Sequence, residues 1–409
     1  MKKVLQVTLG ILTAIGGFVD IGDLLANAET GARFRMNLAW VVVVGVIGIV
    51  VYAEMAGRVA AVSQRPVFEL VRERLGPRAG LLNLVASFFI NFLTLTAEIA
   101  GVAIAISLVA SIHYGLVLPL AGVLVWLVIW RMPFEWMERV FGLAGLALAV
   151  FLVTVWKVGP DWGSLLDAAA SPHVPAGESP FSYAYFGIAL FGAAMTPYEV
   201  FFFSSGAVEE GWTRRDLALN RANVYIGFPL GGLLSLALMA SAHLVLAPRG
   251  VSVDDLAQVA LPVAVVVGKV GLAAVLVGIF AATFGAALET ALSAGYTVSQ
   301  YLGWQWGKYV RPREAARFHL VVVLAILGAT LFALSGVDPV KVTEYSIVLS
   351  AAALPLTYFP ILVIANDPEY MGDRTNGRTL NAIGFLYLVV LVVVAVATIP
   401  LMIITRGGS

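Results

Sequence analysis

Apolar segments alternate with short polar connections along the whole chain. Each apolar segment has roughly 20 residues or more, the length at which an α-helix crosses the hydrocarbon core of a bilayer. We expect about eleven spans, two of them interrupted by helix breakers, and a short amphipathic helix over 253–268. The expected spans are 3–34 (broken between 18 and 22), 37–62, 79–111, 115–130, 136–157, 182–205 (broken at 195–197), 221–247, 270–302, 316–336, 342–365 and 380–404. The pattern predicts an all-α polytopic membrane protein.

Composition supports this class and excludes others. Hydrophobic residues make up 60% of the chain and charged residues 12%, about half the charged fraction of a soluble domain. The absence of cysteine excludes disulfides and thiolate ligands. A net charge of zero gives no sign of nucleic-acid binding. Lys2 and Lys3 precede the first apolar stretch as in a signal peptide, but no small-residue cleavage site follows, so we expect a retained span.

The distribution of basic residues predicts the orientation. With a cytoplasmic N-terminus, 18 of the 25 Lys and Arg residues fall in loops on the cytoplasmic side. Such an excess is typical of the inner side of membrane proteins. We therefore expect a multi-pass protein of a prokaryotic-type plasma (inner) membrane, with its C-terminus outside.

The two broken spans lie five spans apart, which indicates an inverted repeat with a binding site near the middle of the membrane. We expect a single transmembrane domain over 1–409, made of a first five-span repeat (1–157), a second (182–365) and an additional span (380–404). Transport by alternating access follows from such symmetry.

The first break carries two carboxylates among glycines. Gly16, Gly17 and Gly22 let the backbone unwind, and Asp20 and Asp23 lie within an otherwise apolar span. Free carbonyls are tolerated at that depth only where they line a polar cavity. Together with carboxylates they form an oxygen site suited to a hard cation. The alternative is a structural turn in which Asp23 caps the second half-helix.

The second break lies at Thr196-Pro197. Pro197 cannot donate a backbone hydrogen bond, which frees the carbonyl near Ala193, and Thr196 adds a hydroxyl. Glu199 either faces the cavity or pairs with a basic residue near a mouth. Glu98, in the third span, is either part of an ion or proton path or a buried carboxyl bonded to a neighbouring span. Weaker candidates are Glu54, Glu289 and Glu344.

At these residues the chain resembles the natural resistance-associated macrophage protein (NRAMP) family of divalent-metal transporters. The resemblance covers nearly the whole chain and rests on the order and spacing of degenerate motifs. It implies the fold first seen in the leucine transporter, with the site between unwound helices one and six. The motifs that carry it are Asp20-Ile21-Gly22-Asp23, Gly31-Ala32, Glu98-Ile99-Ala100-Gly101, Ala193 with Thr196-Pro197-Tyr198, and Met371-Gly372.

Departures from the family pattern change the expected ion. Asp20 matches the metal-binding Asp, but the family's Asn is Asp23 and its Met is Thr196. Losing the thioether favours Mg²⁺, Ca²⁺ or Mn²⁺ over softer metals, as in the magnesium-transporting relatives that also lack the Met. Tyr198 and Phe203 replace the family's sixth-span histidines, and Leu95 replaces an acidic residue. These changes argue against proton coupling, although Glu98 remains.

We therefore expect a transporter of divalent cations, with Mg²⁺ or Mn²⁺ preferred over Fe²⁺ and no cofactor. The expected state is a monomer in the lipid bilayer. The alternative is a symporter of the same fold for an organic solute such as an amino acid. A receptor or membrane enzyme is disfavoured because no nucleophile–base pair, phosphate loop or catalytic metal motif occurs. The expected ligands are Asp20, Asp23, the Ala193 carbonyl and the Thr196 hydroxyl, and Glu98, Glu199 and Tyr198 are assigned to the ion path or coupling.

Overall fold

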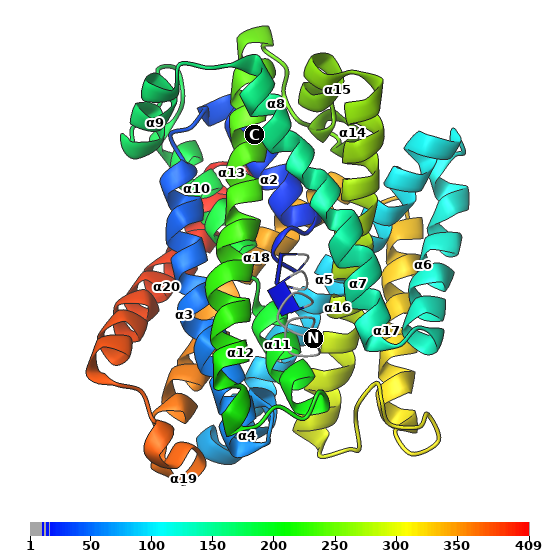
Figure 1. Cartoon of the computed structure of the whole chain (residues 1–409), viewed down its shortest axis with the longest axis vertical. Helices are drawn as coiled ribbons and strands as arrows, with labels where there is room; N and C mark the ends of the chain where they lie inside the picture. The colour runs from blue at the N-terminus through cyan, green and yellow to red at the C-terminus, as the bar shows by residue number, and fades with distance from the viewer. Residues whose placement is uncertain (1–9, 12–13, 16, 409) are drawn as a thin grey trace.

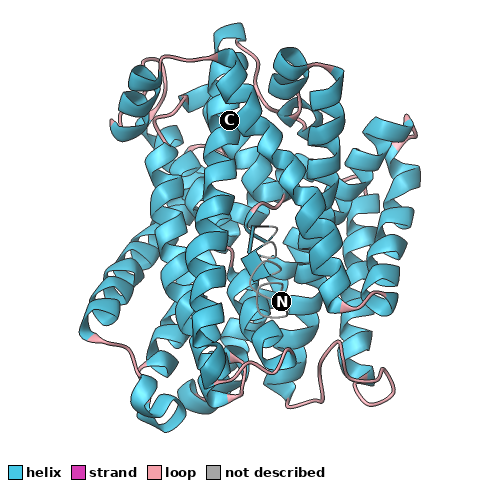
Figure 2. Cartoon of the chain, in the orientation of Figure 1, coloured by secondary structure: helices cyan, strands magenta, loops and turns pink. Residues whose placement is uncertain are grey.

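A computed structural model describes residues 10–11, 14–15 and 17–408, apart from the side chains of residues 134, 135 and 138. Lys2, Lys3, Gly16 and most of the first expected half-span lie outside the described residues. The described part is helical, with no strand in it (Figure 2). The all-α fold class is thereby confirmed.

Ten helices within the described residues are long and apolar enough to cross a membrane. They match the second to eleventh expected spans, and only their ends differ, by up to seven residues. The ten are Ala39–Ser63, Pro77–Ala110, Tyr114–Arg131, Arg139–Val158, Pro180–Glu209, Arg214–Arg249, Lys269–Leu302, Ala316–Leu334, Pro339–Ala365 and Arg378–Ile404.

The individual elements are shorter where a span is interrupted (Figure 1). The first half of the chain contains α2 (Ile21–Phe34), α3 (Ala39–Ser63), α4 (Val67–Leu75), α5 (Pro77–Ala110), α6 (Tyr114–Arg131), α7 (Phe134–Gly145), α8 (Val150–Val158), α9 (Trp162–Ala170), α10 (Pro180–Ala194) and α11 (Pro197–Glu209). The second half contains α12 (Leu217–Ala222), α13 (Phe228–Val245), α14 (Leu256–Val259), α15 (Leu261–Val267), α16 (Lys269–Leu302), α17 (Ala316–Leu334), α18 (Pro339–Ala365), α19 (Pro368–Met371) and α20 (Arg378–Ile404).

Both predicted breaks are present. Gly17 and Phe18 are helical, the backbone leaves the helix at Val19 and Asp20, and α2 begins at Ile21. In the sixth span α10 ends at Ala194 and α11 begins at Pro197. The 253–268 helix is present as two pieces, α14 and α15.

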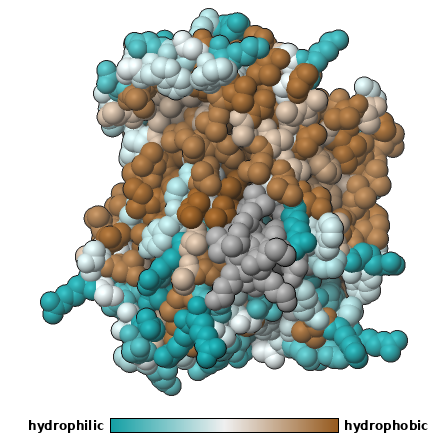
Figure 3. Space-filling model, viewed as in Figure 1, coloured by the Kyte–Doolittle hydropathy of each residue, from teal (hydrophilic) through white to brown (hydrophobic). Residues whose placement is uncertain are grey.

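The surface has the distribution of hydrophobic and hydrophilic residues that is typical of a membrane protein. A hydrophobic belt covers the middle of the molecule and hydrophilic residues gather at its two ends (Figure 3). The short connecting helices α4 and α19 lie at one end, and α9, α14 and α15 lie at the other (Figure 1). Arg72 and Arg74 of α4 are therefore at the opposite end from the α9 region, as the charge distribution predicts.

Small residues bring the central helices close together. A Cβ at Gly31 of α2 would lie 2.3 Å from the Met239 carbonyl oxygen of α13, and one at Gly192 of α10 would lie 2.3 Å from the Ile347 carbonyl oxygen of α18. Such contacts exclude any side chain and are typical of membrane helix interfaces. They fix α2 and α10, the two half-helices next to the breaks, against their neighbours.

Gly192→Ala tests this close packing. Because the added methyl would overlap a backbone oxygen, we expect the free energy of unfolding to fall by about 1–3 kcal/mol. Gly145→Ala is the control, since a Cβ there meets nothing within 4 Å. Thermal unfolding of the purified variants in detergent measures both. Equal midpoints for the two variants would contradict the proposed packing.

Candidate functional site

The start of α2 is held by Asp20. Its backbone is extended (φ −96°, ψ −177°), and its Oδ1 accepts a hydrogen bond of 2.8 Å from the Asp23 N–H. Asp20 is therefore the N-cap of α2. The expected alternative, in which Asp23 is the cap, is wrong, because the helix begins one residue earlier than expected, at Ile21.

Glu98 satisfies a second free donor at the same helix end. Its Oε1 accepts from the Ile21 N–H at 3.0 Å, which joins α5 to α2. The first N–H groups of a helix have no partner within the helix, so a carboxylate there satisfies one of them. Glu98 Oε2 has no hydrogen-bond partner among the described residues and is fully buried. The expected hydrogen bond from Glu98 to a neighbouring span is thus present, and it uses only one of the two carboxylate oxygens.

Tyr198 connects the two breaks. Its hydroxyl lies 3.2 Å from Asp20 Oδ2 and 3.2 Å from the Gly17 carbonyl oxygen. A phenol has one proton, so it donates to one of the two at a time. Tyr198 is in the first turn of α11, so this contact places the start of α11 directly beside the first break.

Asp23 points toward α13. Its Oδ1 accepts from Asn27 Nδ2 at 2.8 Å, and its Oδ2 accepts from Ser235 Oγ at 2.6 Å. Sequence reasoning missed Asn27 and Ser235. Their signal is weak: each is a polar residue inside a membrane helix, and Asn27 stands one helical turn after Asp23.

The second break presents backbone and hydroxyl oxygens. Ala193 is buried near the end of α10, and the residue four positions on, Pro197, has no N–H to donate to its carbonyl. Thr196 is the N-cap residue of α11, but its side chain does not accept a hydrogen bond from the helix backbone. Its hydroxyl lies 3.3 Å from Glu199 Oε2. Glu199 therefore faces inward, at 4% exposure, rather than toward a mouth.

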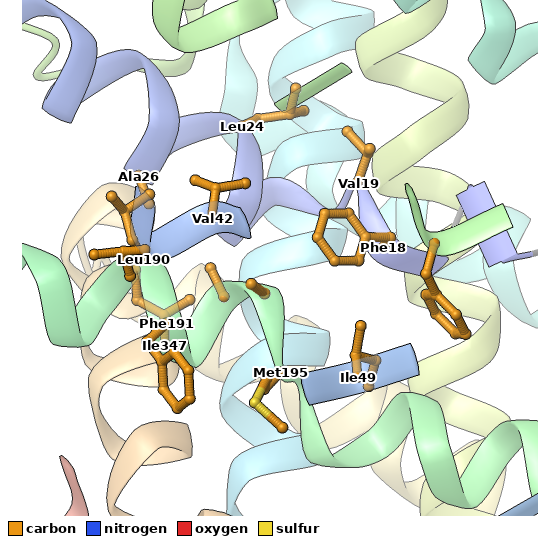
Figure 4. Close-up of a cluster of buried hydrophobic side chains, with 14 of the residues drawn as sticks. Phe18, Val19, Leu24, Ala26, Val42, Ile49, Leu190, Phe191, Met195 and Ile347 are labelled. Carbon is orange, nitrogen blue, oxygen red and sulfur yellow. The ribbon is translucent and has the colours of Figure 1, made fainter. Parts of the chain in front are cut away.

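The sulfur next to this break is turned away from it. A Cβ at Gly48 of α3 would lie 2.6 Å from Met195 Sδ and 2.8 Å from the ring of Tyr387. The Met195 thioether is thus packed against α3 and α20. Figure 4 shows Met195 and Phe191 with Phe18 and Val19 of the first break in one buried apolar cluster. Apolar groups therefore surround the polar atoms of the two breaks.

Glu289, a weak candidate in the sequence, joins the site. A Cβ at Gly17 would lie 2.7 Å from Glu289 Oε2 and 2.8 Å from Glu199 Oε1, so both carboxyl groups approach the first break. The five acidic residues Asp20, Asp23, Glu98, Glu199 and Glu289 are each at most 9% exposed. Buried carboxylates at this density require protons or cations. By contrast, Glu54 forms an ion pair with Arg58 at 3.2 Å.

These acidic groups line a region rather than form a closed cage. Among the residues that the structure describes, no three His, Asp or Glu side chains come together closely enough to hold a metal. An ion at the first break would use Asp20 with backbone, hydroxyl or water oxygens, or a rearrangement of the neighbouring carboxylates. Water-rich coordination of this kind is usual for Mg²⁺.

A protein-family model and curated relatives match most of the chain. The family model described as "Natural resistance-associated macrophage protein-like" matches residues 10–400. A divalent metal cation transporter MntH of Erwinia tasmaniensis is 26% identical over 389 residues, covering 92% of this chain and 89% of that protein. MntH of Deinococcus radiodurans is 23% identical over 385 residues, covering 92% and 85%.

Solved structures share the fold. A variant of the manganese transporter of Eremococcus coleocola superposes with a TM-score of 0.73 at 19% identity, covering 100% of this chain and 88% of that one. Mhp1, a nucleobase-cation-symport-1 family transporter in a closed conformation, gives 0.64 at 15% identity, covering 96% and 91%. The discontinuous helices described above thus belong to a fold known from transporters.

Ser235→Ala tests how Asp23 is held. We expect the free energy of unfolding to fall by about 1–3 kcal/mol, because a buried carboxylate oxygen loses its donor. Ser241→Ala on the same helix is the matched control, since its hydroxyl bonds only the Leu238 carbonyl of its own helix. Thermal unfolding in detergent compares the two. A loss no larger than that of Ser241→Ala would show that Ser235 does not support Asp23.

Proposed function

Because the chain belongs to the natural resistance-associated macrophage protein-like family, we propose that it transports a divalent metal cation across the membrane and prefers a hard ion, Mg²⁺ or Mn²⁺, over Fe²⁺. The observation that carries this proposal is the set of atoms at the two breaks. Asp20, Thr196 and the Ala193 carbonyl offer oxygen, while the thioether of Met195, the residue before Thr196, packs against Gly48. Oxygen ligands favour Mg²⁺ and Mn²⁺. The named relatives support the ion class, since they are divalent metal and manganese transporters rather than enzymes.

The proposed ligands are Asp20, the Ala193 carbonyl and the Thr196 hydroxyl, with Asp23 bound directly or through water. Asp20 Oδ2 accepts a hydrogen bond from the Tyr198 hydroxyl, so an ion that binds this oxygen would replace that hydrogen bond. Asp23 is held by Asn27 and Ser235, which suits an outer role in which it adds charge and orients water. Two carboxylates balance the charge of a divalent ion, and Mg²⁺ often keeps several waters.

Glu98, Glu199 and Tyr198 are proposed to form the ion path. Each contacts a break: Glu98 through the Ile21 N–H, Glu199 through Thr196, and Tyr198 through Asp20. Movement of α11 against α2 would therefore break and remake the Tyr198–Asp20 contact as the site opens to either side. We propose the orientation given by the charge distribution, with the α4 and α19 end in the cytoplasm of a prokaryotic-type cell.

Symport of an organic solute such as an amino acid is the second candidate, favoured only by the likeness of the fold to Mhp1. Its weakness is electrostatic. Asp20 and Asp23 at the first break would repel a substrate carboxylate unless a cation neutralised them. Stabilisation of the purified protein against heat by amino acids but not by metals would favour this candidate.

Asp20→Asn tests the transport proposal. We expect uptake of Mn²⁺ and Mg²⁺ into proteoliposomes to fall roughly 10–100-fold or more, the range seen when even supporting groups of metal sites are removed. Asp167→Asn is the control, because that carboxylate is exposed on α9. Unchanged uptake by Asp20→Asn would overturn the assignment of Asp20 as a ligand.

Thr196→Met tests the ion preference. A thioether at this position should raise the affinity for Cd²⁺ relative to Mg²⁺, because soft ligands favour soft metals. Isothermal titration of the purified protein with Mg²⁺, Mn²⁺, Ca²⁺ and Cd²⁺ measures the ratio. Thr379→Met, exposed at the start of α20, should leave it unchanged. No gain for Thr196→Met over this control would show that Thr196 does not face the ion.

A further inference from the structure

A cavity of about 550 Å³ opens between α3, α8, α9 and α13, away from the two breaks. Trp40 and Val43 of α3 form one wall, and Leu233 and Ala237 of α13 form another. Leu165 and Leu166 of α9 lie over it. It is near the end of the molecule that carries α9, where Figure 1 shows α9 beside the end of α3.

The lining is almost entirely apolar. Every lining residue is Met, Ala, Trp, Val or Leu. A water molecule needs two or more polar partners to remain in a cavity, and this lining offers almost none. An unfilled space of this size would also lose the dispersion contacts that the surrounding side chains could make. The chemistry therefore selects a hydrocarbon occupant.

The position of the cavity indicates that its hydrocarbon occupant comes from the bilayer. Several lining side chains are exposed to the surroundings: Leu166 is 65% exposed, Leu233 47% and Trp40 41%. In the orientation of Figure 1, the face below α9 is part of the hydrophobic belt in Figure 3. The cavity is thus open toward the acyl chains of the bilayer.

Two exposed cations lie next to the lining residues in sequence. Arg35 immediately precedes Met36, and Lys157 follows Val155 by two residues at the end of α8. Both are at the end of the molecule where α9 begins. The nearby Asp161 carboxylate is already engaged as the N-cap of α9, accepting from the Gly163 N–H at 3.1 Å. Arg and Lys side chains form charge-assisted hydrogen bonds with phosphate, the group that phospholipids present at either membrane surface.

We propose that one acyl chain of a membrane phospholipid binds in this cavity, with its phosphate beside Arg35 and Lys157. The bound chain packs against α13, whose cavity face carries Leu233, Leu236, Ala237 and Ala240. At 100° per residue Ser235 lies on the opposite face, where it holds Asp23. The lipid is therefore separated from Asp23 by a single helix.

Ala237→Phe tests the site by filling it. The full-length protein is purified in a mild detergent and the phospholipid that stays bound is counted by native mass spectrometry. Wild type should retain one phospholipid, and Ala237→Phe should lose it. Ala273→Phe, exposed on α16, is the matched control and should retain it. The double variant Arg35→Gln, Lys157→Gln should retain several-fold less than wild type.

A second measurement distinguishes loss of lipid binding from loss of folding. Added phospholipid should raise the thermal midpoint of wild type and Ala273→Phe, and leave that of Ala237→Phe unchanged. Without lipid, the midpoint of Ala237→Phe should equal or exceed that of wild type, since a ring replaces empty space. Equal retention by Ala237→Phe and wild type, or retention of only detergent or free fatty acid, would overturn the proposal.

Discussion

The fold depends on how the polar groups of two interrupted helices are satisfied inside an apolar bilayer. An unpaired N–H or carbonyl at that depth costs several kcal/mol, so a break persists only where side chains replace the missing backbone bonds. Here Asp20 accepts from the Asp23 N–H, Glu98 accepts from the Ile21 N–H, and Tyr198 lies beside the Gly17 carbonyl. These three side chains come from three different spans. The broken helix therefore exists only in the assembled bundle.

The same contacts create the chemistry of the site. Satisfying N–H groups with carboxylates puts negative charge at the start of α2, where the helix dipole favours it. Glu199 and Glu289 add further acidic groups around Gly17. Such a region is stable when cations or protons offset the charge. The features that allow the helix to break thus also prepare it for a cation, and close helix contacts at Gly31 and Gly192 keep the half-helices in place.

Much of this arrangement could be predicted from the sequence. Apolar runs and their breakers give the ten described spans and both interruptions, because span length and proline chemistry act locally. The partners of Asp23 could not be predicted, since Ser235 is 212 positions away and looks like any small residue in a packed helix. The direction of Met195 was also out of reach: its sulfur faces Gly48 because of helix packing, which no local pattern encodes. The division into two repeats remains a prediction.

We propose that the transported ion binds between the two breaks, at Asp20 and Thr196. Crystals of the full chain grown with Mn²⁺, measured at a wavelength where manganese scatters anomalously, locate the ion without reference to transport. We predict a single strong peak within coordination distance of the Asp20 carboxylate and beside the Thr196 hydroxyl, with the Tyr198 contact to Asp20 lengthened. A peak that lies away from both breaks, or no peak at saturating Mn²⁺, would contradict it.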